Sequence, residues 1–427
     1  MTSPQLPPNW THMRLRDVVV PARRRHPGQE DAATFTYIDI DAVDNHSNRV
    51  VRPRPVMRED APSRATNDVR TGDVLFSLVR PYLRNVARVA AELDGGVASS
   101  AFCVLRPSDV ISSDYLFYAL LRPEFIHKVR TYGESPPSAR DEEFLDLEIP
   151  VAPRLIQPLV VRGLEAQLSR LDAAEAGLHS AAAKLRRYRL AVLNAAVSGE
   201  LVMPSTRPRD GRQPWPLVAV GDLATEVRYG TSVKCTADAS GVPVLRMGNI
   251  VDSRLSFRNL KYLPAAHREF PELLLRSGDV LFNRTNSPEL VGKAAVFCGS
   301  PPECSFASYL IRVRTGPELV PDWLVTVLSS SFGRRWVAEV ASQQVGQANV
   351  NGSKLKQFRL PLPSIEEQDA LTAEVTRRLS LVDALTSTID VNVRRSAALR
   401  HRVLRDAFSE QRPSTALRPL AEVDSAV

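Results

Sequence analysis

Hydrophobic and polar positions along the chain follow two different periods. Short runs such as FTYIDI, VPVLRM, DVLFSLV and DVLFN are rich in β-branched and aromatic residues and are separated by Gly, Pro, Asn and Asp, which predicts short strands. Two other stretches instead carry apolar residues at a seven-residue step. The positions are Leu164, Leu171, Leu178, Leu185 and Val192 in the first, and Val375, Val382, Ile389, Ser396 and Val403 in the second, with Leu385 and Leu399 on the adjoining position. A sustained seven-residue step predicts coiled-coil helices.

The same stripes would also suit the core of an ordinary helical bundle. The segments PRLIQP before the first stripe and MPSTRPRDGRQPWP after it isolate each helix from any third one. Forty-odd helical residues at about 1.5 Å each extend on the order of 60 Å. We therefore expect the two helices to pack against each other.

The chain also contains an internal repeat. TGDVLF begins at Thr71 and SGDVLF begins at Ser277, and the surrounding sequence repeats in the same order. PNWTHMRLRDVV matches PWPLVAVGDLAT, SSDYLFYALL matches VPDWLVTVLS, LEIPVAP matches FRLPLPS, and YRLAVLNAAVSGE matches LRHRVLRDAFSEQ, at offsets that drift from 205 to 211 residues. This pattern indicates a duplicated unit of about 210 residues. In each copy we expect Asp114 or Asp322 to cap the helix that follows it.

The sequence thus predicts an α+β fold. We expect two similar mixed α/β domains, separated by two long helices that pack as an antiparallel coiled coil, with approximate two-fold symmetry inside one chain. The expected bounds are 1–153 for the first domain, 154–205 for the first long helix, 206–363 for the second domain, 364–412 for the second long helix and 413–427 for a flexible tail.

Composition favours a soluble protein with a basic surface. Hydrophobic residues make up 44% of the chain and charged residues 24%, and the net charge is +7. Of 55 basic residues seven are Lys and 48 are Arg, the side chain best suited to phosphates and guanine edges, although a GC-rich genome would also give many Arg. With no apolar run long enough to span a membrane and no signal-peptide pattern at the start, we expect a cytoplasmic protein.

Motifs of catalysis are missing from the sequence. It has no P-loop, no glycine-rich dinucleotide loop and no G-x-S-x-G motif. The paired acids Glu142 with Glu143 and Glu366 with Glu367 lie near helix starts, where the helix dipole favours them. Cys298 and Cys304 fit no zinc spacing. We therefore expect a non-catalytic protein that holds no cofactor or metal of its own.

Several stretches together resemble the specificity subunit of type I DNA restriction–modification systems. They are LPPNWTHMRLRDVV and PWPLVAVGDLA at the starts of the two halves, GDVLF twice, LPLPSIEEQDAL before the second long helix and LRRYRLAVLNAAVSGELV at the end of the first. The resemblance covers nearly the whole chain. The start of the first helix, VAPRLIQP, departs from it because Gln157 stands there without a Glu before it.

The resemblance implies a DNA-reading scaffold. Each mixed domain would be a target-recognition domain that reads one half of a bipartite, interrupted site in double-stranded DNA. The long helices would set the spacing and dock two DNA-adenine methyltransferase subunits. S-adenosylmethionine, ATP and Mg²⁺ would then be bound by those methyltransferase subunits and by restriction–translocase subunits.

DNA contacts should come from segments that differ between the two halves. One pair follows the repeated strand, SLVRPYLRN against NRTNSPELVGK, and the other precedes the Pro-flanked strand, TYGESPPSAR against SQQVGQANVNGSK. The candidates are Arg80, Arg84, Tyr132, Ser135, Ser138 and Arg140 in the first half, and Arg284, Asn286, Lys293, Gln343, Gln344, Gln347, Asn349, Asn351 and Lys354 in the second. Arg pairs with guanine and Asn or Gln with adenine, but the same residue types also populate ordinary turns.

Two other classes of function stay open at this stage. The chain could be a coiled-coil adaptor whose domains bind proteins, or an enzyme such as a nuclease with an unfamiliar site. Steep salt dependence of DNA binding would separate a DNA reader from an adaptor.

Overall fold

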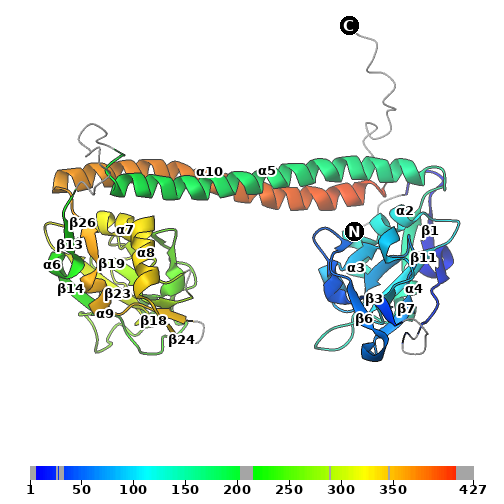
Figure 1. The fold of residues 1–427 in the computed structure, drawn as a ribbon, viewed down its shortest axis with the longest axis horizontal. Helices are drawn as coiled ribbons and strands as arrows, with labels where there is room; N and C mark the ends of the chain where they lie inside the picture. Colours follow the sequence, from blue (N-terminus) through cyan, green and yellow to red (C-terminus); the bar gives the residue numbers. More distant parts are fainter. Residues whose placement is uncertain are drawn as a thin grey trace, which may run out of the picture. The chain divides into compact units, whose positions relative to one another are not determined.

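The chain forms two compact units that each contain one mixed domain. The computed structural model describes residues 6–25, 27, 33–201, 215–287, 290–344 and 347–409, with the backbone alone for 342–344 and 347. Unit 1 comprises Met1–Leu178 and Val391–Val427, and unit 2 comprises His179–Asp390, so the division falls inside both long helices (Figure 1). The expected tail, 413–427, and the first residues of the expected second domain, 206–214, lie outside the described residues.

The domain of unit 1 is built on two four-stranded sheets. One has the order β2 (Val19–Pro21), β11 (Phe102–Pro107), β8 (Val74–Ser77), β9 (Val86–Arg88), and the other the order β6 (Arg54–Met57), β3 (Thr34–Ile38), β10 (Val97–Ser99), β7 (Ala65–Asp68). Two further pairs are β1 (Thr11–Arg14) with β12 (Glu148–Val151) and β4 (Val43–Asp44) with β5 (Arg49–Val50). The helices are α1 (Leu15–Val18), α2 (Ser113–Leu120), α3 (Pro123–Lys128) and α4 (Asp141–Leu145), with short turns η2 (Ile40–Ala42), η3 (Arg58–Asp60), η4 (Pro81–Leu83) and η5 (Ala91–Leu93).

The domain of unit 2 repeats the four-strand order of the first sheet, and its second sheet has three strands where that of unit 1 has four. Its sheets are β14 (Ala224–Tyr229), β23 (Leu310–Thr315), β19 (Val280–Asn283), β21 (Ala294–Val296), and β18 (Lys261–Leu263), β15 (Val242–Leu245), β22 (Ser305–Phe306). The pairs β13 (Leu217–Ala219) with β26 (Arg359–Pro361) and β16 (Ile250–Val251) with β17 (Arg254–Leu255) also recur, and a small sheet β20 (Thr285–Asn286), β25 (Gln347–Asn349), β24 (Ser342–Gln344) is added. The helices are α6 (Val220–Leu223), η6 (Met247–Asn249), α7 (Pro321–Ser329), α8 (Ser331–Val340) and α9 (Gly352–Gln357). The predicted α+β fold with two similar mixed domains and two long helices is confirmed.

The repeated GDVLF stretch is part of the scaffold in both units. In unit 1, Gly72 has a φ of +87°, the conformation that favours glycine, and turns the chain into the fully buried strand β8. The buried carboxylate of Asp73 accepts a hydrogen bond from the backbone N–H of Arg70 at 2.9 Å and pairs with Arg106 at 2.8 Å. The second copy repeats this arrangement with Gly278, Asp279, Arg276 and Arg314. These side chains thus stabilise the start of strand β8 and of its counterpart β19.

The two long helices are α5 (Gln157–Val197) and α10 (Ile365–Asp406), and they run side by side in opposite directions within each unit. All the residues at the predicted seven-residue step are buried or half-buried, whereas Leu385 and Leu399 on the adjoining position are 45% and 47% exposed. An ion pair joins the helices in each unit, Asp172 with Arg400 in unit 1 and Arg189 with Asp383 in unit 2.

The starts of the helices use caps other than those expected. At α2 the hydroxyl of Ser112 accepts the backbone N–H of Tyr115 at 3.4 Å, and Asp114 lies in the first turn. At α7 the first residue is Pro321, which needs no partner for a backbone N–H, and Asp322 follows it. The expectation that Asp114 and Asp322 are the caps was therefore wrong. At α10 Ser364 and Glu367 form a reciprocal capping box.

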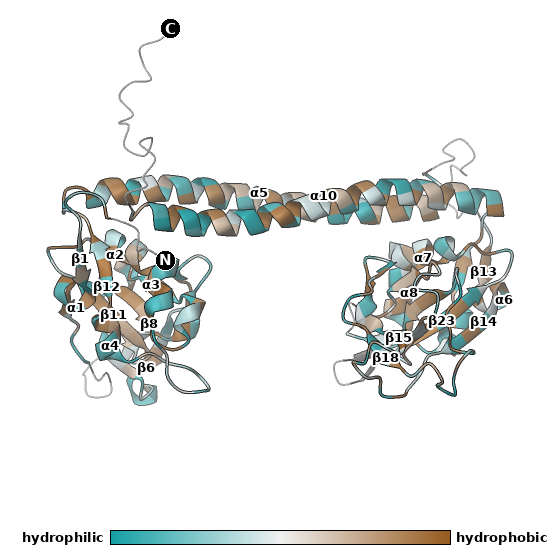
Figure 2. Cartoon of the chain, turned by 180° about the vertical axis from the view of Figure 1, so that it is seen from behind, coloured by the Kyte–Doolittle hydropathy of each residue, from teal (hydrophilic) through white to brown (hydrophobic). Residues whose placement is uncertain are grey.

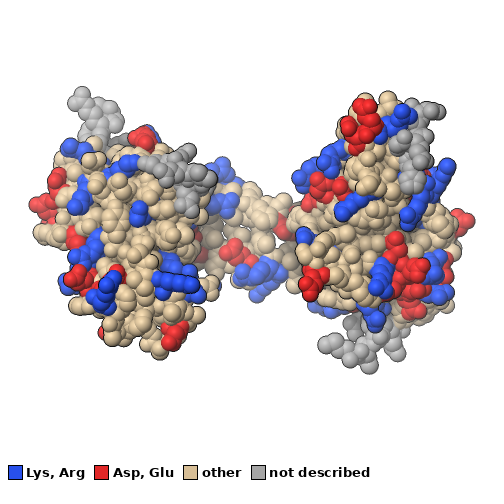
Figure 3. Space-filling view, turned by 90° about the horizontal axis from the view of Figure 1, so that it is seen from below, with Lys and Arg blue, Asp and Glu red and all other residues tan. Residues whose placement is uncertain are grey.

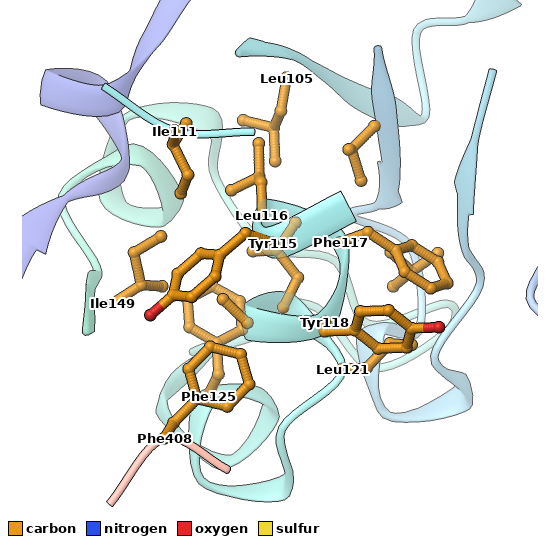
Figure 4. Packing of buried hydrophobic residues seen from close by; sticks show 14 of the residues in the cluster. Leu105, Ile111, Tyr115, Leu116, Phe117, Tyr118, Leu121, Phe125, Ile149 and Phe408 are labelled. Carbon is orange, nitrogen blue, oxygen red and sulfur yellow. The ribbon is translucent and has the colours of Figure 1, made fainter. Parts of the chain in front are cut away.

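The core of each domain is completed by both long helices. In unit 1, Val160 and Leu164 of α5 and Leu404 of α10 belong to the same buried cluster as Trp10. Phe408, just beyond the end of α10, enters this cluster, with its ring centroid 5.1 Å from that of Tyr115 (Figure 4). In unit 2 the corresponding cluster contains Val192 and Val197 of α5, Leu371 and Val375 of α10, and Trp323. Figure 2 shows hydrophobic residues concentrated on the strands of each domain and alternating with hydrophilic ones along both helices.

A fully buried glutamine fixes the start of each long helix. Gln157 accepts a hydrogen bond from the backbone N–H of Ser112 at 2.8 Å and donates to the carbonyls of Val110 at 2.9 Å and Ala152 at 3.0 Å. Gln368 makes the same three bonds in unit 2, with Val320, Glu318 and Pro363. Although VAPRLIQP lacks the Glu–Gln pair of the second copy, its one glutamine keeps the structural role.

Replacing Gln157 by Ala should destabilise unit 1 substantially. The change removes the partner of the Ser112 N–H and of the carbonyls of Val110 and Ala152, and leaving the buried Ala152 carbonyl unsatisfied costs about 1–3 kcal/mol by itself. Thermal unfolding followed by circular dichroism should show a clearly lower midpoint. Gln167→Ala, at an exposed position of the same helix, is the matched control and should leave the midpoint nearly unchanged. Equal effects of the two substitutions would contradict the role given to Gln157.

Candidate nucleic-acid interface

In unit 1 the two segments predicted to contact DNA lie against each other. The backbone N–H of Arg80 donates to the carbonyl of Pro137 at 2.9 Å, and the N–H of Ala139 donates to the carbonyl of Leu78 at 2.8 Å. A β-bridge joins Val79 to Ser138. The segment after strand β8 and the segment before helix α4 therefore form one continuous edge of the domain.

The same convergence occurs in unit 2 with a different backbone structure. Strand β20 pairs with β25, which places Thr285 opposite Asn349 and Asn286 opposite Ala348. The backbone N–H of Val350 donates to the carbonyl of Arg284 at 2.9 Å. The two divergent segments of each half thus meet at the corresponding place, directly beyond the repeated strand.

The exposed side chains of unit 1 include one organised cluster. The Arg140 guanidinium lies 4.2 Å from the ring centre of Tyr132, and Glu143 accepts a hydrogen bond from the Tyr132 hydroxyl at 2.7 Å. This hydrogen bond raises the pKa of Tyr132 above its ordinary value. Ser135 is exposed and Ser138 half-buried. Arg80 is exposed, and its side chain makes no hydrogen bond or ion pair with any other described residue, so its donors are available to a ligand.

Arg84 points elsewhere. Its guanidinium is half-buried and lies 2.7 Å from Nε2 of His401 on α10. Desolvation, and secondly the positive charge of Arg84, lower the pKa of His401 below its ordinary value of 6.5. In the free protein Arg84 is therefore engaged with the long helix.

The candidates of unit 2 that follow β19 are partly engaged within the domain. The Arg284 guanidinium lies over the ring of Tyr229, 4.8 Å from its centre, and donates to the carbonyl of Ser308 at 3.2 Å. The Asn286 side chain accepts a hydrogen bond from the backbone N–H of Ser287 at 2.9 Å. Lys293 is half-buried.

The amide-rich segment of unit 2 is divided between capping and the small sheet. Asn351 caps α9 by accepting the backbone N–H of Lys354 at 2.9 Å, and the Lys354 ammonium donates to the carbonyl of Val340 at 2.6 Å. Asn349 is half-buried in β25. Gln343 and Gln344 lie on β24 and Gln347 on β25, but their side chains lie outside the described residues.

Two aromatic residues at these edges were not among the sequence candidates. Tyr82, in the turn between Arg80 and Arg84, is 58% exposed, and Tyr309, whose carbonyl accepts the backbone N–H of Arg284, is 50% exposed. In contacts with duplex DNA, the hydroxyl of an exposed Tyr beside Arg can bond a phosphate oxygen. The Arg-Pro-Tyr-Leu-Arg stretch carried this signal for Tyr82, since its aromatic residue stands between basic ones.

On the face seen in Figure 3, the charged side chains do not form one basic stripe. Lys and Arg form separate groups among acidic side chains in both domains (Figure 3).

Among the described residues no set of three or more His, Cys, Asp or Glu side chains is placed to hold a metal ion. No helix within the described ranges is both long and apolar enough to cross a membrane.

Removing Arg84 should raise the pKa of His401 toward 6.5, since it removes a neighbouring positive charge. Because the pKa of His401 is lower in the folded protein than in the unfolded chain, this group makes the protein less stable as the pH falls below about 6.5. Arg84→Ala should reduce that loss. Proton NMR titration of the His401 ring measures the pKa directly, and Arg80→Ala is the control that should leave it unchanged. An unaltered pKa in Arg84→Ala would contradict the contact.

Curated proteins with similar sequences share one description. The chain is 26% identical over 307 residues to the type I restriction enzyme EcoKI specificity subunit of Escherichia coli (strain K12), covering 70% of this chain and 64% of that protein. It is 25% identical over 298 residues to the StySPI specificity subunit of Salmonella potsdam, covering 69% of this chain and 63% of that protein. The matched region thus spans less than two thirds of these relatives. No protein-family model matches the chain.

Solved structures show the same fold over almost the whole chain. A chain from a structure of complex assembly and conformational transition in the type I R-M system has a TM-score of 0.78 at 24% identity, covering 96% of this chain and 100% of its own. The HsdS subunit from Thermoanaerobacter tengcongensis has a TM-score of 0.57 at 25% identity, covering 95% and 98%. In sequence and in its duplicated fold, the chain is thus similar to type I restriction enzyme specificity subunits.

Proposed function

We propose that the chain is the sequence-specific DNA-binding subunit of a type I restriction–modification complex, and that each mixed domain reads one half of a bipartite, interrupted site. The observation that carries this proposal is the convergence of the divergent segments at the same place in both units. To read two different half-sites, a protein needs two different contact edges, and here the same frame presents one such edge in each unit. DNA readers with two related modules meet half-sites in this way.

The side chains at the two edges suit different base sequences. Unit 1 offers Arg80, whose free guanidinium can bond the O6 and N7 acceptors of guanine, beside the Tyr132–Arg140 stack. Unit 2 offers Asn286 and Asn349 on a small sheet, and amides pair with adenine. Arg284 and Lys354, whose charged groups donate to backbone carbonyls in the free protein, would position the edge or contact phosphates. The target would therefore be asymmetric.

The long helices would set the gap between the half-sites and dock two DNA-adenine methyltransferase subunits. Their outer faces carry exposed apolar side chains: Leu381, Leu385 and Leu399 of α10, and Tyr188 and Leu190 of α5. Methyltransferase subunits would supply S-adenosylmethionine chemistry, and restriction–translocase subunits would supply ATP and Mg²⁺ chemistry. The chain itself would contribute recognition and no catalysis.

Binding to duplex DNA carrying the cognate site should fall steeply as salt rises, because phosphate contacts release counterions. Arg80→Ala should weaken specific binding by about 1–3 kcal/mol if the side chain contacts a guanine, and should relax the preference at that base pair. Arg187→Ala, an exposed arginine on α5, is the matched control and should have little effect. Fluorescence anisotropy at several salt concentrations measures the DNA affinity of the unaltered chain and of both variants.

Two outcomes would contradict the proposed function. Salt-insensitive or undetectable DNA binding would favour a protein-binding adaptor, for which the exposed apolar helix faces would also be suited. Cleavage or methylation of DNA by the isolated chain, given Mg²⁺ and S-adenosylmethionine, would mean that the chain carries its own active site.

A further inference from the structure

Inside their common frame, the two units differ in how the space is filled where helix α2 or α7 faces the long helices. In unit 2 a cavity of about 560 Å³ lies there, lined by residues of α7, β21, the β16–β17 hairpin and both long helices. This volume is within the usual range for small-molecule sites. No residue among the DNA-contact candidates lines it.

In unit 1 the corresponding place is filled by large side chains. Arg88 of β9 forms an ion pair with Asp114, and its guanidinium carbon lies 5.1 Å from the ring centre of Phe117. Tyr118 packs edge-on against Phe117, with 5.0 Å between ring centroids, and its hydroxyl approaches Glu165 of α5 at 3.5 Å. A guanidinium and two rings thus occupy the space between α2 and α5.

The strand register establishes which residues correspond. Arg88 stands opposite Val74 of the repeated strand, and Val296 stands opposite Val280, the same residue of the second copy. Along the helices Phe117 corresponds to Val325, Tyr118 to Thr326 and Glu165 to Thr376. All four residues of unit 2 are smaller than their counterparts, and all four line the cavity. The cavity therefore exists because these side chains are missing.

Unit 2 nevertheless keeps the carboxylate that pairs with Arg88 in unit 1. Asp322, the counterpart of Asp114, lines the cavity and has no basic partner among the described residues. Although it remains accessible to solvent, partial desolvation raises the pKa of its carboxyl above the ordinary value. Arg189 and Arg254 also line the cavity, but both already pair with Asp383. The site therefore combines a carboxylate that has no basic partner among the described residues with apolar side chains such as Val296 and Leu379.

We propose that this cavity binds a small organic cation, an alkylguanidinium or alkylammonium compound, whose charged group pairs with Asp322 and whose aliphatic part lies among Val296, Val325 and Leu379. The ligand takes the place that the Arg88 side chain takes in unit 1. This site is independent of DNA reading, because its residues are separate from the two divergent edges.

Calorimetric titration of the full-length chain with n-butylguanidinium tests the proposal. We expect one site per chain, with millimolar affinity for so small a ligand. Asp322→Asn should weaken binding at least about tenfold, since it removes the charge-assisted hydrogen bonds. Val296→Arg should abolish binding, because the new guanidinium occupies the site as Arg88 does in unit 1.

Two further variants make the result decisive. Asp114→Asn changes the corresponding acid of unit 1 and should leave binding unaltered. Thr326→Tyr restores a unit 1 residue without adding charge, and should block the site even if Val296→Arg does not fold. No binding by the unaltered chain well above millimolar concentration, or binding that persists in both Asp322→Asn and Thr326→Tyr, would overturn the proposal.

Discussion

The structure depends on the burial of side chains from both long helices in the core of each mixed domain. An isolated helix pair with so narrow an apolar stripe would gain little from its own packing, and helices in water depend on tertiary contacts for stability. Val160 and Leu404 supply those contacts in unit 1, as Val192 and Val375 do in unit 2. Full burial of one such side chain contributes about 1.5–3 kcal/mol. Helix pairing and domain folding are therefore coupled, and Gln157 and Gln368 fix where each helix starts.

The two halves share the residues that hold each domain together, and they differ in the segments predicted to contact DNA. The buried Asp73 and Asp279, the paired glutamines and the ion pairs Asp172–Arg400 and Arg189–Asp383 recur at matching positions in the two halves. The segments beyond the repeated strand have diverged, and so has the interior beside Asp322. Residues that hold the frame cannot distinguish one half-site from another, so differences in specificity have to come from the segments that the frame presents.

Features that depend on hydrophobic periodicity or on the internal repeat could be predicted from the sequence. Contacts between residues that are far apart along the chain could not. The seven-residue step located both helices, and the repeated GDVLF located a buried strand. No local pattern indicates that Arg84 meets His401, 317 positions away, or that the two divergent segments of each half join. Asp114 looked like a cap because Asp often is one, but Ser112 stands where the helix begins. Gln157 looked like a remnant because its three partners become visible only in the folded chain.

The central claim is that each mixed domain reads its own half of the DNA site. Exchange of residues 206–363 for the corresponding region of a relative, followed by mapping of methylated adenines in the host genome, tests it most directly. If each domain reads its own half-site, one half of the methylated sequence changes, while the other half and the gap stay the same. A change in both halves, or a change in the gap alone, would contradict it.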